Sequence, residues 1–130
     1  QRASACVSEF GSGFVPAEVR SAAQQADLAT ALSSLTQTHF FLGASYTNGA
    51  YRWDSNGAAL SDTYSTFADG EGSGGTSQPA ICVAKSFPGY PKWHDCNVAS
   101  AYHQVCMATT AGGGEAGLVV NPNECDRDYS

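Results

Sequence analysis

The sequence predicts a single domain of the α+β class, in which helices come first and antiparallel strands follow. Helix-forming alanine, leucine and glutamine are concentrated before residue 38, and aromatic and β-branched residues separated by turn residues dominate after it. The length supports one domain over residues 1–130, because a chain of this size buries roughly two thirds of its unfolded surface in one core.

Two helices are expected in the first third of the chain. Residues 1–10, QRASACVSEF, contain good helix formers and precede Gly-Ser-Gly, where a glycine can adopt the left-handed conformation that ends a helix. In residues 16–37, apolar side chains recur at three- and four-residue steps, which gives one weakly apolar helix face. The residues of that face are Val19, Ala22, Ala23, Ala26, Ala29 and Leu32.

Strands are expected from residue 38 onward. In residues 38–54, THFFLGASYTNGAYRWD, aromatic and β-branched residues flank Asn48-Gly49, a pair that supplies the positive φ angles of a tight hairpin turn. Residues 55–80 are rich in turn residues and too long for an ordinary connection, which indicates a functional or mobile segment. Short strands are then expected in residues 81–87, 92–96, 102–109 and 117–120.

Composition and charge indicate a compartment and disfavour some partners. The formal net charge is −6, with 6 Lys and Arg against 12 Asp and Glu, which disfavours binding to the phosphates of nucleic acid. Five cysteines in a chain with only 14% charged residues are typical of a secreted domain whose loops are joined by disulfides. No apolar run approaches the ~20 residues of a membrane span, so we expect no such span. From the cysteines we expect a secreted, extracellular protein.

Residues 92–106, KWHDCNVASAYHQVC, admit three interpretations. His94, Cys96, His103 and Cys106 could supply four zinc ligands, but the gap between the two pairs is short for a structural zinc site. A cysteine–histidine nucleophile would also need an orienting group and an oxyanion donor set, and nothing else in the chain indicates them. An oxidising compartment favours the third interpretation, in which these cysteines form disulfides, and we expect no enzyme.

A series of short motifs follows in a characteristic order along the chain. The motifs are AC…F, FVPAE, FFLGA, YRWD, YSTF, ICV, KWHDC and YHQVC, and they run from residue 1 to about residue 108. This order resembles the C-type lectin-like domain. In that family a helix bears the first cysteine, a second helix and a W-I-G-L-type strand follow, and a long loop precedes the pattern C-V…W-x-D…C…V-C.

The resemblance implies a fold and a disulfide pattern. The fold would be C-type lectin-like, with two helices, antiparallel sheets and a long irregular loop. The first disulfide would join the opening helix to the last core strand, and the second would lie in the long-loop region. The implied pairs are Cys6 with Cys106 and Cys82 with Cys96. Trp93 and Tyr102 are expected to pack in the core.

The chain departs from the family at both ends. The family has a strand before its first helix that pairs with the last strand, whereas here residues 109–130 form a C-terminal extension. We expect residues 117–120 to pair antiparallel beside residues 102–108 in place of that strand, although an upstream segment removed by cleavage would also explain its absence. The fifth cysteine, Cys125, is either a free thiol or the link of a disulfide-bonded dimer.

The resemblance also implies where calcium and sugar would bind. In the family, a Glu-Pro-Asn or Gln-Pro-Asp triplet, a further Glu and the Asn-Asp of W-N-D hold the calcium ion, which takes six to eight oxygen ligands. The triplet position here is Glu71-Gly72-Ser73 or, less well placed, Gln78-Pro79-Ala80. Glu71 and Asp95 are the expected calcium ligands. The set is incomplete, because His94 replaces the asparagine, and it implies calcium binding that is weak or absent.

Two functions follow from the resemblance. The first is a secreted carbohydrate-binding module that recognises glycans through residues 62–96, with polar side chains that orient the sugar against an aromatic surface. The candidate polar contacts are Asp69, Glu71, Ser73, Gln78, His94 and Asp95, and the candidate aromatic contacts are Tyr64, Phe67 and Tyr90. The second is a calcium-independent module that binds a protein or another surface and has lost sugar binding.

Overall fold

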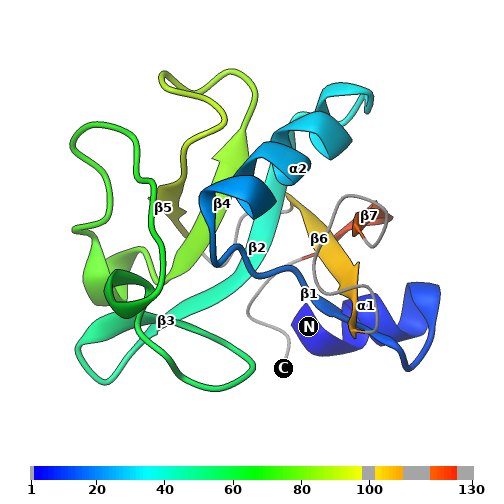
Figure 1. Ribbon diagram of the computed structural model, residues 1–130, viewed down its shortest axis with the longest axis horizontal. Helices are drawn as coiled ribbons and strands as arrows, with labels where there is room; N and C mark the ends of the chain where they lie inside the picture. Colours follow the sequence, from blue (N-terminus) through cyan, green and yellow to red (C-terminus); the bar gives the residue numbers. More distant parts are fainter. Residues whose placement is uncertain (1, 98–101, 110–117, 126–130) are drawn as a thin grey trace.

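The computed structural model describes residues 2–97, 102–109 and 118–125, with the side chains of residues 5–97, 102–109 and 118–122 (Figure 1). The described elements are α1 (Arg2–Phe10), β1 (Phe14–Pro16), α2 (Ala22–Ser33), β2 (His39–Thr47), β3 (Ala50–Trp53), the 3-10 turns η1 (Leu60–Asp62) and η2 (Gly75–Ser77), β4 (Ala80–Ala84), β5 (His94–Cys96), β6 (Tyr102–Ala108) and β7 (Leu118–Cys125). The α+β prediction is confirmed. Within the described ranges, no helix has the length and apolar character of a membrane span.

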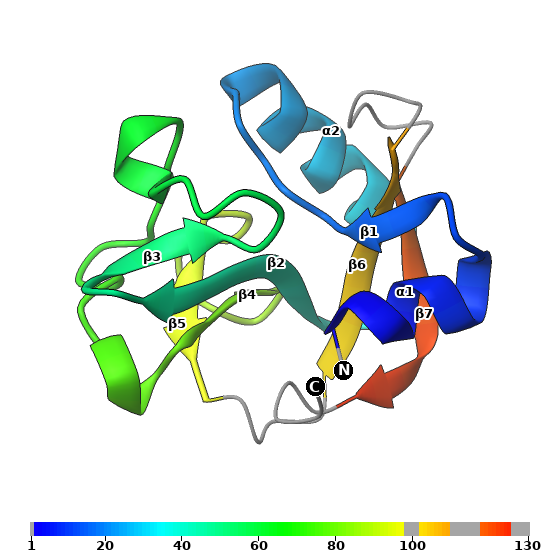
Figure 2. The ribbon, with the colours of Figure 1, turned by 90° about the horizontal axis from the view of Figure 1, so that it is seen from below.

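A seven-stranded mixed sheet joins the described strands. Its order is β1-β6-β2-β4-β5, with β3 paired to β2 and β7 paired to β6. The central strand β2 pairs in parallel with β6 and antiparallel with β3 and β4, so the expected antiparallel pattern has one parallel exception. Figure 2 shows β3, β4 and β5 with their loops on one side of β2, and β1, β6, β7 and α1 on the other.

The second helix is shorter than predicted, because it begins only after Ser21. The Ser21 side chain accepts a hydrogen bond from Gln24 N at 3.1 Å and caps the helix. Leu28 and Leu32 form its buried face. The predicted face was wrong in the first turns, where three alanines are exposed, namely Ala22, Ala23 and Ala26. The chain before the helix instead forms β1 against β6.

The predicted hairpin between β2 and β3 is confirmed. Asn48 and Gly49 adopt φ angles of 49° and 82°, and Thr47 lies opposite Ala50 in the register. This turn sends β3 back along β2 and so starts the long loop beside the sheet.

Both implied disulfides are present. Cys6 is bonded to Cys106 and Cys82 to Cys96, with Cα atoms 5.7 Å and 6.1 Å apart. The first bond closes a sequence separation of 100 residues and ties α1 to β6. A loop of that length corresponds to roughly 4–5 kcal/mol in the chain-entropy model. Because Cys96 and Cys106 are in disulfides, neither is available as a zinc ligand or a nucleophile.

Strand β7 covers one edge of β6, as expected for the C-terminal extension. Val105 lies opposite Val120, and the pairing continues to Tyr102 opposite Cys125, so the strand is longer than predicted. Gly117 lies outside the described residues. The side chain of Cys125 does too, and the interchain disulfide therefore stays a prediction.

The core forms around two tryptophans. Trp53 and Trp93 are fully buried, with their rings edge to face at 5.6 Å, so the expected burial of Trp93 is confirmed. Tyr102 is half-buried and packs on Phe41, 5.2 Å away, beside the second disulfide. The core thus lies directly under β5 and the loops beside it.

Candidate functional site

The long loop, residues 54–79, connects β3 to β4 and is held at its middle by β5 and the residue before it. Phe67 lies beside Trp93 in a parallel bridge. Ala68 N donates to Trp93 O, and Trp93 N donates to Thr66 O, both at 2.8 Å. Because Trp93 is buried, these bonds fix the middle of the loop to the core.

Asp95 fixes the second half of the loop. It is 3% exposed. Its Oδ1 accepts a hydrogen bond from Gly72 N at 3.1 Å, and its Oδ2 accepts one from Gly74 N at 2.5 Å. Hydrogen bonds to an ionised carboxylate are about twice as strong as those between neutral groups. A side chain of the sheet therefore fixes residues 72–74 of the loop.

Tyr51 extends this cluster from β3. Its hydroxyl lies 2.9 Å from Gln78 O and 3.2 Å from Asp95 Oδ2, so that its proton can be donated to either oxygen, and Gly75 N donates to the hydroxyl at 2.9 Å. Burial raises the pKa of Tyr51 to about 12, so the hydroxyl keeps its proton at neutral pH. Tyr51 and Asp95 together hold the part of the loop that precedes β4.

Glu71 and Asp95 form a pair of carboxyl groups. The hydrogen bond between the two side chains raises the pKa of Glu71, and burial and the charge of Asp95 raise it further. Burial also raises the pKa of Asp95, but the hydrogen bonds from Glu71 and from the Gly72 and Gly74 amides lower it more, so the net shift is downward. When the pair holds one proton, that proton is on Glu71.

The donor set around Asp95 does not fit a calcium ion. Glu71 and Asp95 lie together as the resemblance implied, but both oxygens of Asp95 already accept hydrogen bonds from the protein. His94 stands where an amide ligand is expected, and imidazole is a poor ligand for a hard cation. Among the described residues, no group of three or more His, Cys, Asp and Glu side chains could hold a metal.

Of the other predicted polar contacts, Gln78 also lies beside Asp95, because a Cβ on Gly74 would be 2.6 Å from Gln78 Oε1 and 2.5 Å from Asp95 Oδ2. Asp69, Ser73 and Gln78 are exposed along the loop. His94 is buried, and its ring stacks on Phe87 with centroids 4.1 Å apart and planes 9° apart. Burial lowers the pKa of His94, so the ring is neutral at neutral pH. His94 packs beneath Phe87 and faces the interior.

The predicted aromatic contacts pack largely against the core. Tyr64 and Phe67 meet the ring of Trp93 edge-on at 6.0 Å and 5.8 Å, and both are half-buried. Tyr90 is also half-buried, and its hydroxyl oxygen is enclosed. These three rings therefore support the loop more than they present a flat face to a ligand.

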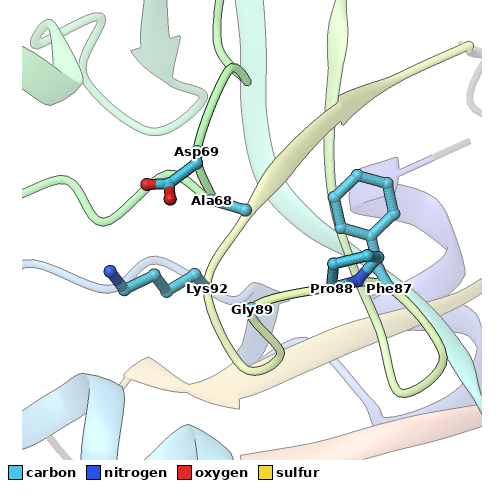
Figure 3. Close-up of a pocket in the computed structure, with 6 residues that line it drawn as sticks. All are labelled: Ala68, Asp69, Phe87, Pro88, Gly89 and Lys92. Carbon is cyan, nitrogen blue, oxygen red and sulfur yellow. The ribbon is translucent and has the colours of Figure 1, made fainter.

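A pocket of about 270 Å³ lies between the long loop and the turn that joins β4 to β5 (Figure 3). We refer to it as the loop pocket, and it is lined by Ala68, Asp69, Phe87, Pro88, Gly89 and Lys92. Figure 3 shows Asp69 and Lys92 extending in the same direction, one from the loop and one from the turn. A Cβ added at Gly89 would lie 3.2 Å from the Cβ of Ala68, which shows how closely the turn approaches the loop.

Sequence reasoning found only one member of this pocket, Asp69. Phe87 and Lys92 were missed, because they were expected at the ends of strands over residues 81–87 and 92–96, whereas β4 ends at Ala84 and β5 begins at His94, which leaves both residues in the turn. The one available signal was that the turn, KSFPGYPK, carries two aromatic residues and two lysines just before the KWHDC motif. This composition indicates an unusual turn, but it does not indicate which part of the fold the turn lies against.

Comparison with known proteins identifies the fold. No family model and no curated protein matches the chain. Among solved structures, the C-type lectin CEL-I from Cucumaria echinata is similar with a TM-score of 0.63 at 19% identity, over 81% of this chain and 78% of that one. An EPNH mutant of CEL-I gives a TM-score of 0.63 at 20% identity, over 81% and 77%. The chain therefore has the fold of a C-type lectin-like domain.

Proposed function

We propose that this chain is an extracellular carbohydrate-binding module that holds a glycan in the loop pocket and does not require calcium. The observation that carries the proposal is the pocket itself, which combines apolar walls with two charged side chains at the long loop. The structural similarity to C-type lectins supports the class of ligand. The two disulfides are compatible with an extracellular location.

The chemistry of the pocket suits one sugar residue. A sugar ring has apolar C–H faces and hydroxyl groups at its edge, so it needs an apolar surface with a few placed polar groups. Phe87 and Pro88 supply the apolar surface, and Asp69 and Lys92 supply an acceptor and a donor. The volume of about 270 Å³ lies just below the ~300–1,000 Å³ range of small-molecule sites, which favours a single ring.

The hydrogen bonds of Asp95 support binding without calcium. In a calcium-dependent site the ion would order the loop and coordinate the sugar hydroxyls. Here Asp95 orders the loop through the Gly72 and Gly74 amides. Asp95 is not among the residues that line the pocket, so that a glycan there needs no contact with it.

A glycan array tests the proposal, with the chain probed in calcium and in a chelator. We expect binding to defined glycans that chelation leaves unchanged and that Asp69→Ala abolishes. The matched control is Asp62→Ala, an exposed aspartate of η1 in the same loop, which should bind as the unmodified chain does. Loss of binding on chelation would contradict calcium independence. Absence of binding to every glycan in either condition would contradict the function.

A further inference from the structure

Three of the four Lys and Arg side chains that the structure describes are bound to other groups of the protein. Arg20 pairs with the buried carboxylate of Glu18. Arg52 donates to three backbone carbonyl oxygens, and the ammonium of Lys85 donates to Leu35 O. Among the Lys and Arg side chains that the structure describes, this leaves Lys92 as the one without a hydrogen-bond or ion-pair partner. It lines the loop pocket.

Asp69 is likewise exposed and without a partner among the described residues, although it lines the same pocket as Lys92. The two groups do not form an ion pair with each other, since the one ion pair between described side chains joins Arg20 to Glu18. An ammonium and a carboxylate that point the same way without bonding are both free to contact a ligand.

From this arrangement we infer that the loop pocket selects a sugar residue that carries a carboxylate. The inference rests on the proposed function and adds the class of sugar. The sugar carboxylate pairs with the Lys92 ammonium, and a hydroxyl of the same ring donates to Asp69. A neutral sugar would satisfy Asp69 and leave the Lys92 charge unpaired.

The charge of the whole chain limits the ligand to one acidic residue. At a net charge of −6, the protein repels a polyanion over distances of about 10 Å at 0.1 M salt. To bind a sulfated polysaccharide, a protein needs several Lys or Arg side chains along the length of the polymer. In the described part of the chain, only Lys92 is without a hydrogen-bond or ion-pair partner. The expected ligand is therefore a glycan that ends in a single uronic or sialic acid residue.

Paired sugars provide the test. The isotope-labelled chain is titrated with methyl glucuronide and with methyl glucoside, which differ only in the carboxylate, and the dissociation constants are measured by NMR. We expect the acidic sugar to bind about tenfold more tightly, the size of one charge-assisted hydrogen bond, with the largest shifts in residues 68, 69 and 87–92. Raising the salt concentration should reduce the preference.

Two variants of Lys92 sharpen the result. Lys92→Gln removes the charge and should bring the two dissociation constants together, whereas Lys92→Arg keeps the charge and should keep the preference. Equal affinity for both sugars in the unmodified chain would overturn the acid preference while glycan binding stands. A preference that survives in Lys92→Gln would overturn the role of Lys92. If none of the three sugars, methyl glucuronide, methyl glucoside and methyl sialoside, shifts the NMR signals of the chain, both the inference and the proposed function are contradicted.

Discussion

The backbone amide of Gly74 donates to the buried carboxylate of Asp95 at 2.5 Å, and this contact joins the second half of the long loop to β5. The two residues are far apart in the sequence but adjacent in the fold, because the chain returns through β4 and the following turn. The same carboxylate accepts from Gly72 N. A protein side chain thus supplies the negative charge that orders the loop.

The close approach at Gly74 predicts that any side chain there destabilises the loop. A Cβ at this position would lie 2.5 Å from Asp95 Oδ2 and 2.6 Å from Gln78 Oε1. The Gln78 amide can swing aside, but the Gln78 Cβ, 2.7 Å away, is fixed to the backbone, and Asp95 is buried and held by its hydrogen bonds, so both clashes remain. We expect Gly74→Ala to lower the free energy of unfolding by about 1–3 kcal/mol, measured by urea denaturation.

Gly13→Ala is the matched control for that variant. A Cβ at Gly13 meets no atom within 4 Å, and its φ is not in the left-handed region. The control should therefore unfold at the same urea concentration as the unmodified chain. Equal midpoints for Gly74→Ala and Gly13→Ala would show that the loop does not approach Asp95 as described.

We also expect Asp95→Asn to lower the free energy of unfolding. Asparagine keeps one acceptor oxygen but presents an amide NH₂ group where the Gly72 or Gly74 amide needs an acceptor. Losing a hydrogen bond to a charged group costs about 2–3 kcal/mol. Protease cleavage within residues 69–78 should increase in the native protein, and mass spectrometry of the fragments would locate it.

An exposed aspartate in the same loop is the control for Asp95→Asn. Asp62→Asn should change stability by less than about 0.5 kcal/mol, as surface substitutions usually do. If both variants are equally stable and equally resistant to protease, Asp95 does not hold the loop.

The Glu71 and Asp95 pair predicts how stability depends on pH. The pKa of Glu71 is raised above its usual 4.5, so its contribution to stability is complete below pH 4.5 and is lost as the pH rises through the raised value. Glu71→Gln removes the second negative charge and keeps a donor for Asp95. The variant should match the unmodified chain near pH 4.5 and be more stable at pH 7.

The pKa of Asp95 is shifted the other way, so its contribution is present above its usual 3.8 and is lost as the pH falls through the lowered value. Glu71→Gln should therefore still unfold in strong acid. Thermal melts at each pH measure both effects. A variant whose stability follows that of the unmodified chain from pH 4.5 to pH 7 would contradict the pairing of the two carboxyl groups.

Cys125 is either a free thiol or the link of a covalent dimer, and the two alternatives can be told apart. Its backbone ends β7, and the four other cysteines are paired within the chain. In an oxidising compartment, its partner for a disulfide would therefore be Cys125 of a second copy. A non-reducing gel of thiol-blocked protein should show a band at twice the 13.5 kDa chain mass, and Cys125→Ser should remove it. A monomer band alone in the unmodified protein would refute the dimer.

The covalent frame and the hairpin were predictable because their signals are local or ordered along the chain. The order of the motifs gave the resemblance to the C-type lectin-like domain, and that resemblance implied the two disulfides, whereas Asn48-Gly49 indicated the turn by its conformational preference alone. β1 was missed, because three residues that include Pro16 are too few to show the alternation of a strand.

The chemistry of the site was less predictable, because it depends on backbone paths. The resemblance implied that Asp95 is a calcium ligand, but its partners include loop amides, whose positions no residue type specifies. The pocket depends on how closely the turn at Gly89 approaches Ala68. Lys92 became informative only once the partners of Arg20, Arg52 and Lys85 were known.

Thermal unfolding in a chelator and in millimolar calcium tests most directly whether the protein orders its own long loop. A ligand that binds only the folded chain raises the melting temperature in proportion to the logarithm of its concentration. With the Asp95 oxygens bonded to Gly72 and Gly74, we predict the same melting temperature in both conditions. A melting temperature that rises with calcium, and does so no longer in Glu71→Gln, would contradict the account.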